Sequence, residues 1–212
     1  DAVLRFAVAG RDLFPAYLDA LRERTALDVP IDRTGILELA IDREPPAHPA
    51  GSEWIDARTL RTIEPTLAAF PGALLHPYDG SVDNVILLQA MRRLVRSYSG
   101  VTVVAARARA LDLSGARPRV LLAGDEAVEG GCVVLAGGAW VAQLSGLPRP
   151  LPVRPVRGQM LSLGASGLRH VTYGGGGYLV PRTGGRTLVG ATMEHVGFDS
   201  STTPEARASL TA

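Results

Sequence analysis

The most informative stretch of this sequence is Tyr178-Leu179-Val180-Pro181-Arg182-Thr183-Gly184-Gly185-Arg186-Thr187-Leu188-Val189-Gly190-Ala191-Thr192-Met193-Glu194. Apolar and β-branched residues form two short runs, and the Gly-Gly pair between them is a turn signal. The pattern predicts two strands joined by this turn, with Tyr178 entering the first strand and Met193 following the second. A hairpin of this kind implies an antiparallel sheet in this part of the chain.

Further strand patterns surround the hairpin. Residues 36–41, 72–75, 159–163 and 170–173 are short apolar or alternating runs bounded by turn residues. Together they predict an antiparallel sheet built from two separate segments, residues 30–80 and 150–195. The Pro-rich residues 44–51 are expected to form a loop, and the amphipathic residues 8–24 a helix.

A different pattern occupies the middle of the chain. Residues 88–98 place apolar side chains on one helical face, with Asp83 as a suitable N-cap. Strands are predicted at residues 101–104, 120–122 and 132–136, and the last is apolar on both faces, as in a central parallel strand. A helix followed by a buried strand is typical of an α/β nucleotide-binding domain.

The predicted fold class is therefore mixed α/β and α+β, with part of a Rossmann-like domain interleaved with an antiparallel-sheet domain. We predict four segments: residues 1–27 as a helical connection, 28–83 as the first part of the sheet domain, 84–146 as the nucleotide-binding part, and 147–212 as the second part of the sheet domain.

Composition excludes several classes of function. The 212 residues carry a net charge of +1, which gives no electrostatic pull toward nucleic acid or a membrane surface. All 22 basic residues other than histidine are Arg, so a Schiff-base lysine and a phosphate-loop lysine are both excluded. We find no signal peptide and no apolar run long enough to span a membrane, and expect a cytoplasmic protein.

Cysteine and histidine give no sign of a metal site. The only cysteine, Cys132, lies in an apolar run and is expected to be a buried core thiol. The four histidines are scattered without ligand spacing, so no metal is predicted. His76, before Pro77, is interpreted as a satisfied or exposed histidine rather than a catalyst. No catalytic side chain is predicted.

The glycines of this sequence form no dinucleotide-binding fingerprint. Residues 174–177 are four glycines without G-x-G-x-x-G spacing, and we interpret them as a flexible loop, with a backbone-lined access loop over a pocket as the alternative. The run Ala136-Gly137-Gly138-Ala139-Trp140 follows a predicted buried strand, where α/β folds bring backbone amides to a ligand. An ordinary tight turn with Trp140 as a core anchor explains this run equally well. Arg154, Arg157 and Arg182 could each bind a carboxylate.

The ordered motifs resemble a known family. Six motifs occur in the following order: Arg11-Asp12-Leu13-Phe14-Pro15, Arg33-Thr34-Gly35, Asp79-Gly80-Ser81-Val82-Asp83, Ala136-Gly137-Gly138-Ala139-Trp140, Val156-Arg157-Gly158-Gln159 and the hairpin. Their order and spacing resemble the glycine oxidase branch of the D-amino-acid oxidase superfamily, which uses FAD and is tied to thiamine biosynthesis. The resemblance covers nearly the whole chain.

The resemblance implies roles for particular residues. Tyr178 and Met193 correspond to substrate-binding residues, the tyrosine on the substrate carboxylate and the methionine in a small pocket. Ala108, Ala136, Gly137, Gly138 and Trp140 correspond to FAD-binding positions. The implied reaction oxidises a small amino acid by hydride transfer to FAD, with O2 as acceptor and H2O2 as product. A homo-oligomer is compatible with the resemblance.

Two parts of the family pattern are missing from these residues. The G-x-G-x-x-G fingerprint is expected before Asp1, and the arginine that binds the substrate carboxylate is expected after Ala212. Two alternatives therefore stay open. The first is a sarcosine-type oxidase or an amino-acid dehydrogenase with another acceptor. The second is a non-catalytic fragment that has lost flavin binding.

Overall fold

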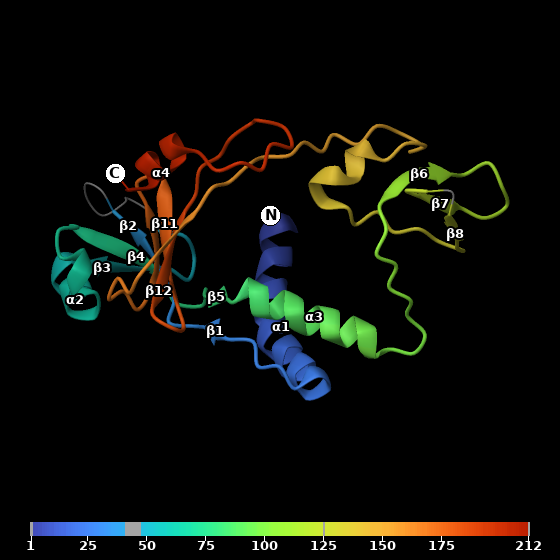
Figure 1. Ribbon diagram of the computed structural model, residues 1–212. Helices are drawn as coiled ribbons and strands as arrows, with labels where there is room; N and C mark the ends of the chain where they lie inside the picture. The colour runs from blue at the N-terminus through green and yellow to red at the C-terminus, as the bar shows by residue number, and fades with distance from the viewer. Residues whose placement is uncertain (1, 41–47, 125, 212) are drawn as a thin grey trace. The chain divides into compact units, whose positions relative to one another are not determined.

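The computed structural model describes residues 2–40, 48–124 and 126–211 (Figure 1). The chain divides into two compact units. One contains residues 1–101, 159–192 and 203–212, and the other contains residues 102–158 and 193–202. Each unit is described by itself. The predicted loop at residues 44–51 lies mostly outside the described residues.

The first unit is organised around a seven-stranded sheet. Neighbouring strands are antiparallel except β2 and β10, which are parallel. Across the sheet the order is β3 (Glu53–Asp56), β4 (Gly72–His76), β2 (Ile36–Leu39), β10 (Val171–Gly174), β11 (Gly177–Arg182), β12 (Arg186–Gly190) and β9 (Leu161–Leu163). The predicted sheet of two sequence-distant segments is confirmed, and the single parallel pair is where the segments join.

One face of this sheet is buried beneath a short helix. Leu37 on β2 is fully buried and packs in a cluster with Leu60 of α2 (Ala57–Ile63) and Leu67 of the 3₁₀ helix η1 (Pro65–Leu67). Asp56 begins α2 by accepting a hydrogen bond from the Thr59 backbone N–H at 2.8 Å. Because side chains alternate along a strand, Glu38 lies on the opposite face from Leu37.

Two glycine turns shape the strands that follow. Gly174 pairs with Gly177, so Gly175 and Gly176 form the two-residue turn between β10 and β11. Their φ angles, 59° and 89°, are in the left-handed region that such hairpin turns require. The prediction of a flexible loop at residues 174–177 was therefore wrong, because backbone pairing continues through Gly174 and Gly177. Gly184 and Gly185 lie in the predicted turn between β11 and β12, which also includes Thr183.

Two helices form a second core within the same unit. Leu18 and Leu21 of α1 (Ala2–Thr25) pack with Ala90 of α3 (Asn84–Ser97). Asp83 caps α3 as predicted, accepting from the Val85 and Ile86 backbone N–H groups at 3.0 Å each. The strands β1 (Ile31–Asp32) and β5 (Ser81–Val82) pair beside these helices, and α4 (Pro204–Thr211) is the last helix described.

The second unit contains a three-stranded antiparallel sheet and a 3₁₀ helix. Its elements are β6 (Ala108–Asp112), β7 (Arg119–Leu122), β8 (Ala127–Glu129) and η2 (Gly138–Gln143). The predicted strands at residues 101–104 and 132–136 are wrong, since no strand of the described chain pairs with either. Cys132 is correspondingly exposed, which corrects the expectation of a buried thiol.

The mixed α/β fold class is confirmed. The assignment of segments to FAD-binding and substrate domains stays a prediction. Within the described residues, no helix combines the length and the apolar character needed to cross a membrane.

Candidate functional site

The second unit contains a pocket of about 860 Å³ that gathers most of the predicted cofactor residues. Ala108 at the start of β6 lines it together with Ala136, Gly137 and Trp140. Gly138, the fifth predicted residue, begins η2 with a φ of 54° and is not among the lining residues. The fold therefore unites residues that are far apart in the sequence, because η2 and the segment before it lie against β6.

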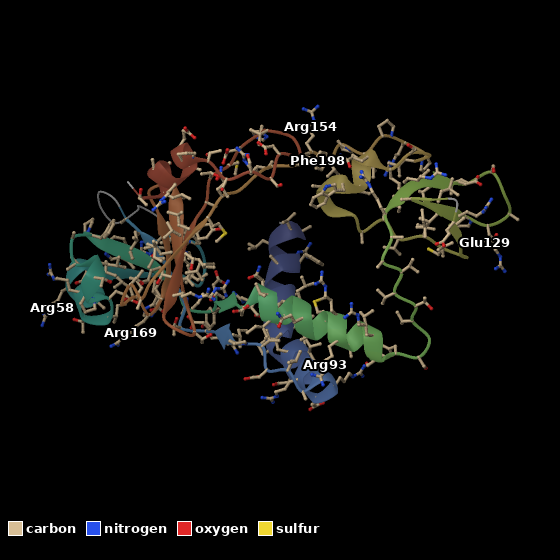
Figure 2. All side chains as sticks on the ribbon, in the orientation of Figure 1. Arg58, Arg93, Glu129, Arg154, Arg169 and Phe198 are labelled. Atoms are coloured by element: carbon tan, nitrogen blue, oxygen red, sulfur yellow. The ribbon has the colours of Figure 1, made fainter. Side chains whose placement is uncertain are left out.

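The lining of this pocket is mostly apolar and includes two arginines. Trp140 is 64% exposed, and its ring lies 5.8 Å from that of Phe198, which Figure 2 labels. The guanidinium groups come from Arg107, which donates to Gln143 Oε1 at 3.3 Å, and Arg109, which donates to the Leu122 carbonyl at 3.0 Å. Apolar walls with a flat aromatic ring and nearby cations suit a heteroaromatic ligand that carries phosphate.

A second pocket, of about 450 Å³, lies in the first unit and contains Tyr178. Tyr173, Tyr178 and Ala191 line it together with the glycine turn between β10 and β11. The half-buried Tyr178 points its hydroxyl at Met160 Sδ, 3.7 Å away. Thioether sulfur is a weak hydrogen-bond acceptor, so the Tyr178 hydroxyl can donate its proton to a stronger acceptor.

Beside this pocket is a polar cluster that sequence reasoning missed. Tyr173 donates a hydrogen bond to Glu38 Oε2 at 2.8 Å, and His76 Nε2 lies 3.3 Å from both of those oxygens. The rings of His76 and Tyr173 stack with centroids 6.2 Å apart. Burial, followed by the hydrogen bond to Glu38, raises the pKa of Tyr173 to about 12. His76 is thus a satisfied histidine, as interpreted from the sequence.

Local sequence patterns gave little signal for this cluster. Glu38 on β2 and Tyr173 on β10 are register partners in the parallel strand pair. His76 on β4 is the register partner of Ile36 on β2. The one sign of this cluster in the sequence was Glu38, a charged residue within the otherwise apolar strand Ile36–Leu39.

Met193 is not on the hairpin strands. It follows β12 and falls in the second compact unit, where its side chain is 78% exposed. Its role as a residue that limits substrate size therefore stays a prediction, as does the role of Tyr178.

The arginines singled out from the sequence differ in their partners. Arg157 donates to Glu194 Oε2 at 2.6 Å and to Asp199 Oδ2 at 2.7 Å, and its side chain is 10% exposed. Arg182 donates to the Val82 carbonyl at 2.7 Å. Both therefore hold protein segments together. Arg154 is exposed, and Figure 2 shows it directed away from the ribbon.

Among residues 2–40, 48–124 and 126–211, no group of three or more His, Cys, Asp or Glu side chains is placed to hold a metal ion.

A match to a known protein family defines the class of protein to which this chain belongs. The family model of FAD dependent oxidoreductases (DAO) matches residues 1–212. The chain belongs to this family, whose cofactor is FAD.

Within this family, the chain is similar to several individual proteins. The chain is 32% identical to the bifunctional protein ThiO/ThiG of Synechocystis sp., covering 96% of the chain and 32% of that protein. It is 30% identical to a glycine oxidase of Pseudomonas aeruginosa, covering 100% of the chain and 61% of that protein. The crystal structure of glycine oxidase from Geobacillus kaustophilus superposes with a TM-score of 0.88 at 26% identity, covering 99% of this chain and 61% of that one. The chain is thus glycine oxidase-like and spans less than two thirds of these relatives.

The residues of the larger pocket fit part of an FAD molecule. The indole of Trp140 and the apolar walls suit an aromatic ring system, and Arg107 and Arg109 suit phosphate. The volume is within the range of roughly 300–1,000 Å³ that is typical of cofactor and ligand sites. No residue of this chain forms the G-x-G-x-x-G turn that would bind the pyrophosphate. These residues are therefore suited to hold one portion of the cofactor.

Proposed function

We propose that the protein containing this chain oxidises the amine of glycine or a similarly small amino acid, in the manner of a glycine oxidase. The observation that carries the proposal is Tyr178, whose hydroxyl has only a weak acceptor and which lines a pocket in the sheet of the first unit. The matches to glycine oxidases over the whole chain support it.

Tyr178 would bind the substrate carboxylate. Its hydroxyl proton would leave the thioether of Met160 for a carboxylate oxygen, because a charged acceptor makes the stronger hydrogen bond. Met193 would limit the size of the substrate side chain. The paired strands β11 and β12 would keep Tyr178 in one orientation, which favours a single binding pose.

Ala108, Ala136, Gly137, Gly138 and Trp140 would hold FAD. Four of the five line one pocket, and Gly138 begins the 3₁₀ helix at its edge. The small side chains at positions 108, 136 and 137 leave room for a flat ring, and Trp140 offers an aromatic face.

When bound in this pocket, FAD would supply the two-electron redox chemistry between the amino-acid Cα–H and O2, with H2O2 as the reduced product, and the released imine would hydrolyse to a 2-oxo acid and ammonia. The protein residues orient the substrate and exclude water, and none is required to act as a base. The ThiO/ThiG relative supports a link to thiamine biosynthesis.

The test uses the complete protein that contains this chain. We expect a flavin absorbance band, and glycine-dependent consumption of O2 with release of an equal amount of H2O2. A colourless protein would contradict the proposal and favour a fragment without flavin. A yellow protein that oxidises glycine with an artificial acceptor but not with O2 would instead identify a dehydrogenase. Greater activity on sarcosine than on glycine would favour a sarcosine-type oxidase.

Tyr178→Phe tests the assigned residue. Loss of one hydrogen bond to a charged group should raise the KM for glycine by about tenfold or more. Tyr98→Phe is the matched control, since this tyrosine on the surface lies outside the pocket. An unchanged KM in Tyr178→Phe would remove this residue from the substrate site.

A further inference from the structure

The Tyr178 side chain crosses a neighbouring strand to reach a methionine. Tyr178 on β11 is the register partner of Gly190 on β12, and its ring lies over the Gly190 backbone. The next strand in the sheet is β9, and Met160 directly precedes its first residue. The Tyr178 hydroxyl reaches Met160 Sδ at 3.7 Å. Because position 190 has no side chain, this hydroxyl contacts a residue beyond the adjacent strand.

Met160 is accessible to small oxidants. It is 46% exposed, between Met91 at 41% and Met193 at 78%, which are the other two methionines of these 212 residues. An exposed thioether can be oxidised to the sulfoxide, which reductases convert back to the thioether. Exposure therefore permits oxidation at all three positions. What distinguishes Met160 is its contact with the Tyr178 hydroxyl.

Oxidation by H2O2 would give this sulfur a strong hydrogen-bond acceptor. A lone pair of Sδ attacks one peroxide oxygen, so that the S–O bond forms as the O–O bond breaks. The proton on the transferred oxygen passes to the departing hydroxide, which leaves as water. The sulfur loses two electrons and the peroxide gains them. The thioether is a weak acceptor, whereas the sulfoxide is polar.

The distance between the two side chains suits a sulfoxide. An S–O bond inclined to an O–H···O hydrogen bond of about 2.7 Å spans the 3.7 Å between Sδ and the Tyr178 hydroxyl oxygen. The Tyr178 hydroxyl would then donate to the sulfoxide oxygen. A substrate carboxylate would have to displace this hydrogen bond, where before oxidation it displaces only a weak contact with sulfur.

We propose that Met160 is a site of reversible oxidation by H2O2, and that its sulfoxide takes the Tyr178 hydroxyl away from the substrate carboxylate. The inference rests on the proposed function, in which Tyr178 binds the carboxylate and H2O2 is the reduced product. Met160 is thus a positioning residue that acts through Tyr178. By oxidising it, the protein's own product lowers the affinity for glycine.

The first experiment adds H2O2 to the complete, FAD-loaded protein and locates the transferred oxygen by peptide mass spectrometry. We expect one oxygen on Met160. We also expect an ultraviolet difference spectrum from Tyr178, because its hydroxyl gains a stronger acceptor. Tyr178→Phe should lose this difference spectrum and still gain the oxygen on Met160. An unoxidised Met160, or the same difference spectrum in Tyr178→Phe, would overturn the inference.

Glycine kinetics provide the second readout. Peroxide treatment should raise the KM for glycine about three- to tenfold, the usual effect of one hydrogen bond, and leave kcat within about twofold. Methionine sulfoxide reductase should restore the starting KM. A fall in kcat with an unchanged KM, or a raised KM that the reductase does not reverse, would contradict the positioning role.

Two leucine variants assign the effect to one sulfur. In Met160→Leu, which conserves an apolar side chain of similar volume, peroxide should no longer raise the KM. Met91→Leu is the matched control on α3, and we expect it to keep the KM and the full sensitivity to peroxide. Both variants retain Met193, so any effect of its oxidation is common to them. An equal rise in KM in the two variants would overturn the inference.

The outcomes distinguish this inference from the proposed function. Absence of glycine-dependent H2O2 production by the untreated protein would contradict the proposed function. Added H2O2 would still test Met160 in that case, because the mass and the tyrosine difference spectrum require no turnover.

Discussion

The ring of Tyr178 on β11 lies directly against the backbone of Gly190, its register partner on β12. A Cβ atom added at Gly190 would fall 2.5 Å from the Tyr178 hydroxyl oxygen, and closer still to the ring. The absence of a side chain at position 190 is therefore what allows Tyr178 to take its place in the pocket.

Gly190→Ala should displace Tyr178. Overpacking of this kind costs about 1–3 kcal/mol, and we expect a lower free energy of unfolding in urea together with a higher KM for glycine. Gly164→Ala is the matched control, because a Cβ at Gly164 meets no atom within 4 Å. Tyr178→Ala should relieve the clash, so the double variant should lose less stability than the sum of the two single ones. Additive losses would contradict direct contact.

Ala108→Trp should block the larger pocket. A large ring at this position fills the space assigned to FAD, and we expect at least about a tenfold loss of FAD affinity in the complete protein, which corresponds to about 1.4 kcal/mol. Val128→Trp adds the same ring to β8 outside the pocket and serves as the control. Unchanged flavin content in Ala108→Trp, measured by absorbance after dialysis, would exclude this pocket as the cofactor site.

Tyr173 should lose its hydroxyl proton at a higher pH than an ordinary tyrosine. Its folded-state pKa is raised from 10.0 to about 12, so the neutral form is favoured in the folded protein. The resulting stability is present below pH 10 and is lost as the pH rises through about 12. The difference in phenolate absorbance between the unmodified protein and Tyr173→Phe should show the late transition, and Glu38→Gln should move it to lower pH. A difference transition near pH 10 would contradict the Glu38 contact.

Acid should loosen the segment that Arg157 holds. Hydrogen bonds from the Ser201 backbone and hydroxyl, and then the charge of Arg157, lower the pKa of Asp199. A lowered carboxyl pKa contributes stability at pH values above the ordinary 3.8, and this contribution is lost as the pH falls through the folded-state pKa. Asp199→Asn should remove that part of the pH dependence.

Tryptophan fluorescence can follow this loosening. Trp140 lies beside Phe198, and with Trp54 replaced by Phe it is the remaining tryptophan of these 212 residues and reports on the second unit. Urea unfolding of Trp54→Phe at several pH values should show stability falling with acid, and adding Asp199→Asn should flatten the curve. Identical curves for the two proteins would rule out a contribution from Asp199.

Much of the first unit was predictable from local sequence. Two runs of apolar and β-branched residues predicted β11 and β12, and the Gly184-Gly185 pair predicted their turn. Asp83 predicted the start of α3 because its carboxylate satisfies backbone N–H groups at the helix end. The predicted strand at residues 132–136 failed because an apolar run forms a strand only when another strand pairs with it.

By itself, the sequence determined the strands and the turn of the hairpin, the N-cap of α3 and the resemblance to FAD-dependent oxidases. Only the tertiary structure decided that Glu38, Tyr173 and Tyr178 share one row, and that Ala108 meets Trp140 in one pocket. The physical reason is that local patterns arise from steric and hydrogen-bonding preferences of adjacent residues. Strand register between β2 and β10 depends instead on hydrogen bonds and side-chain packing between segments distant in the chain.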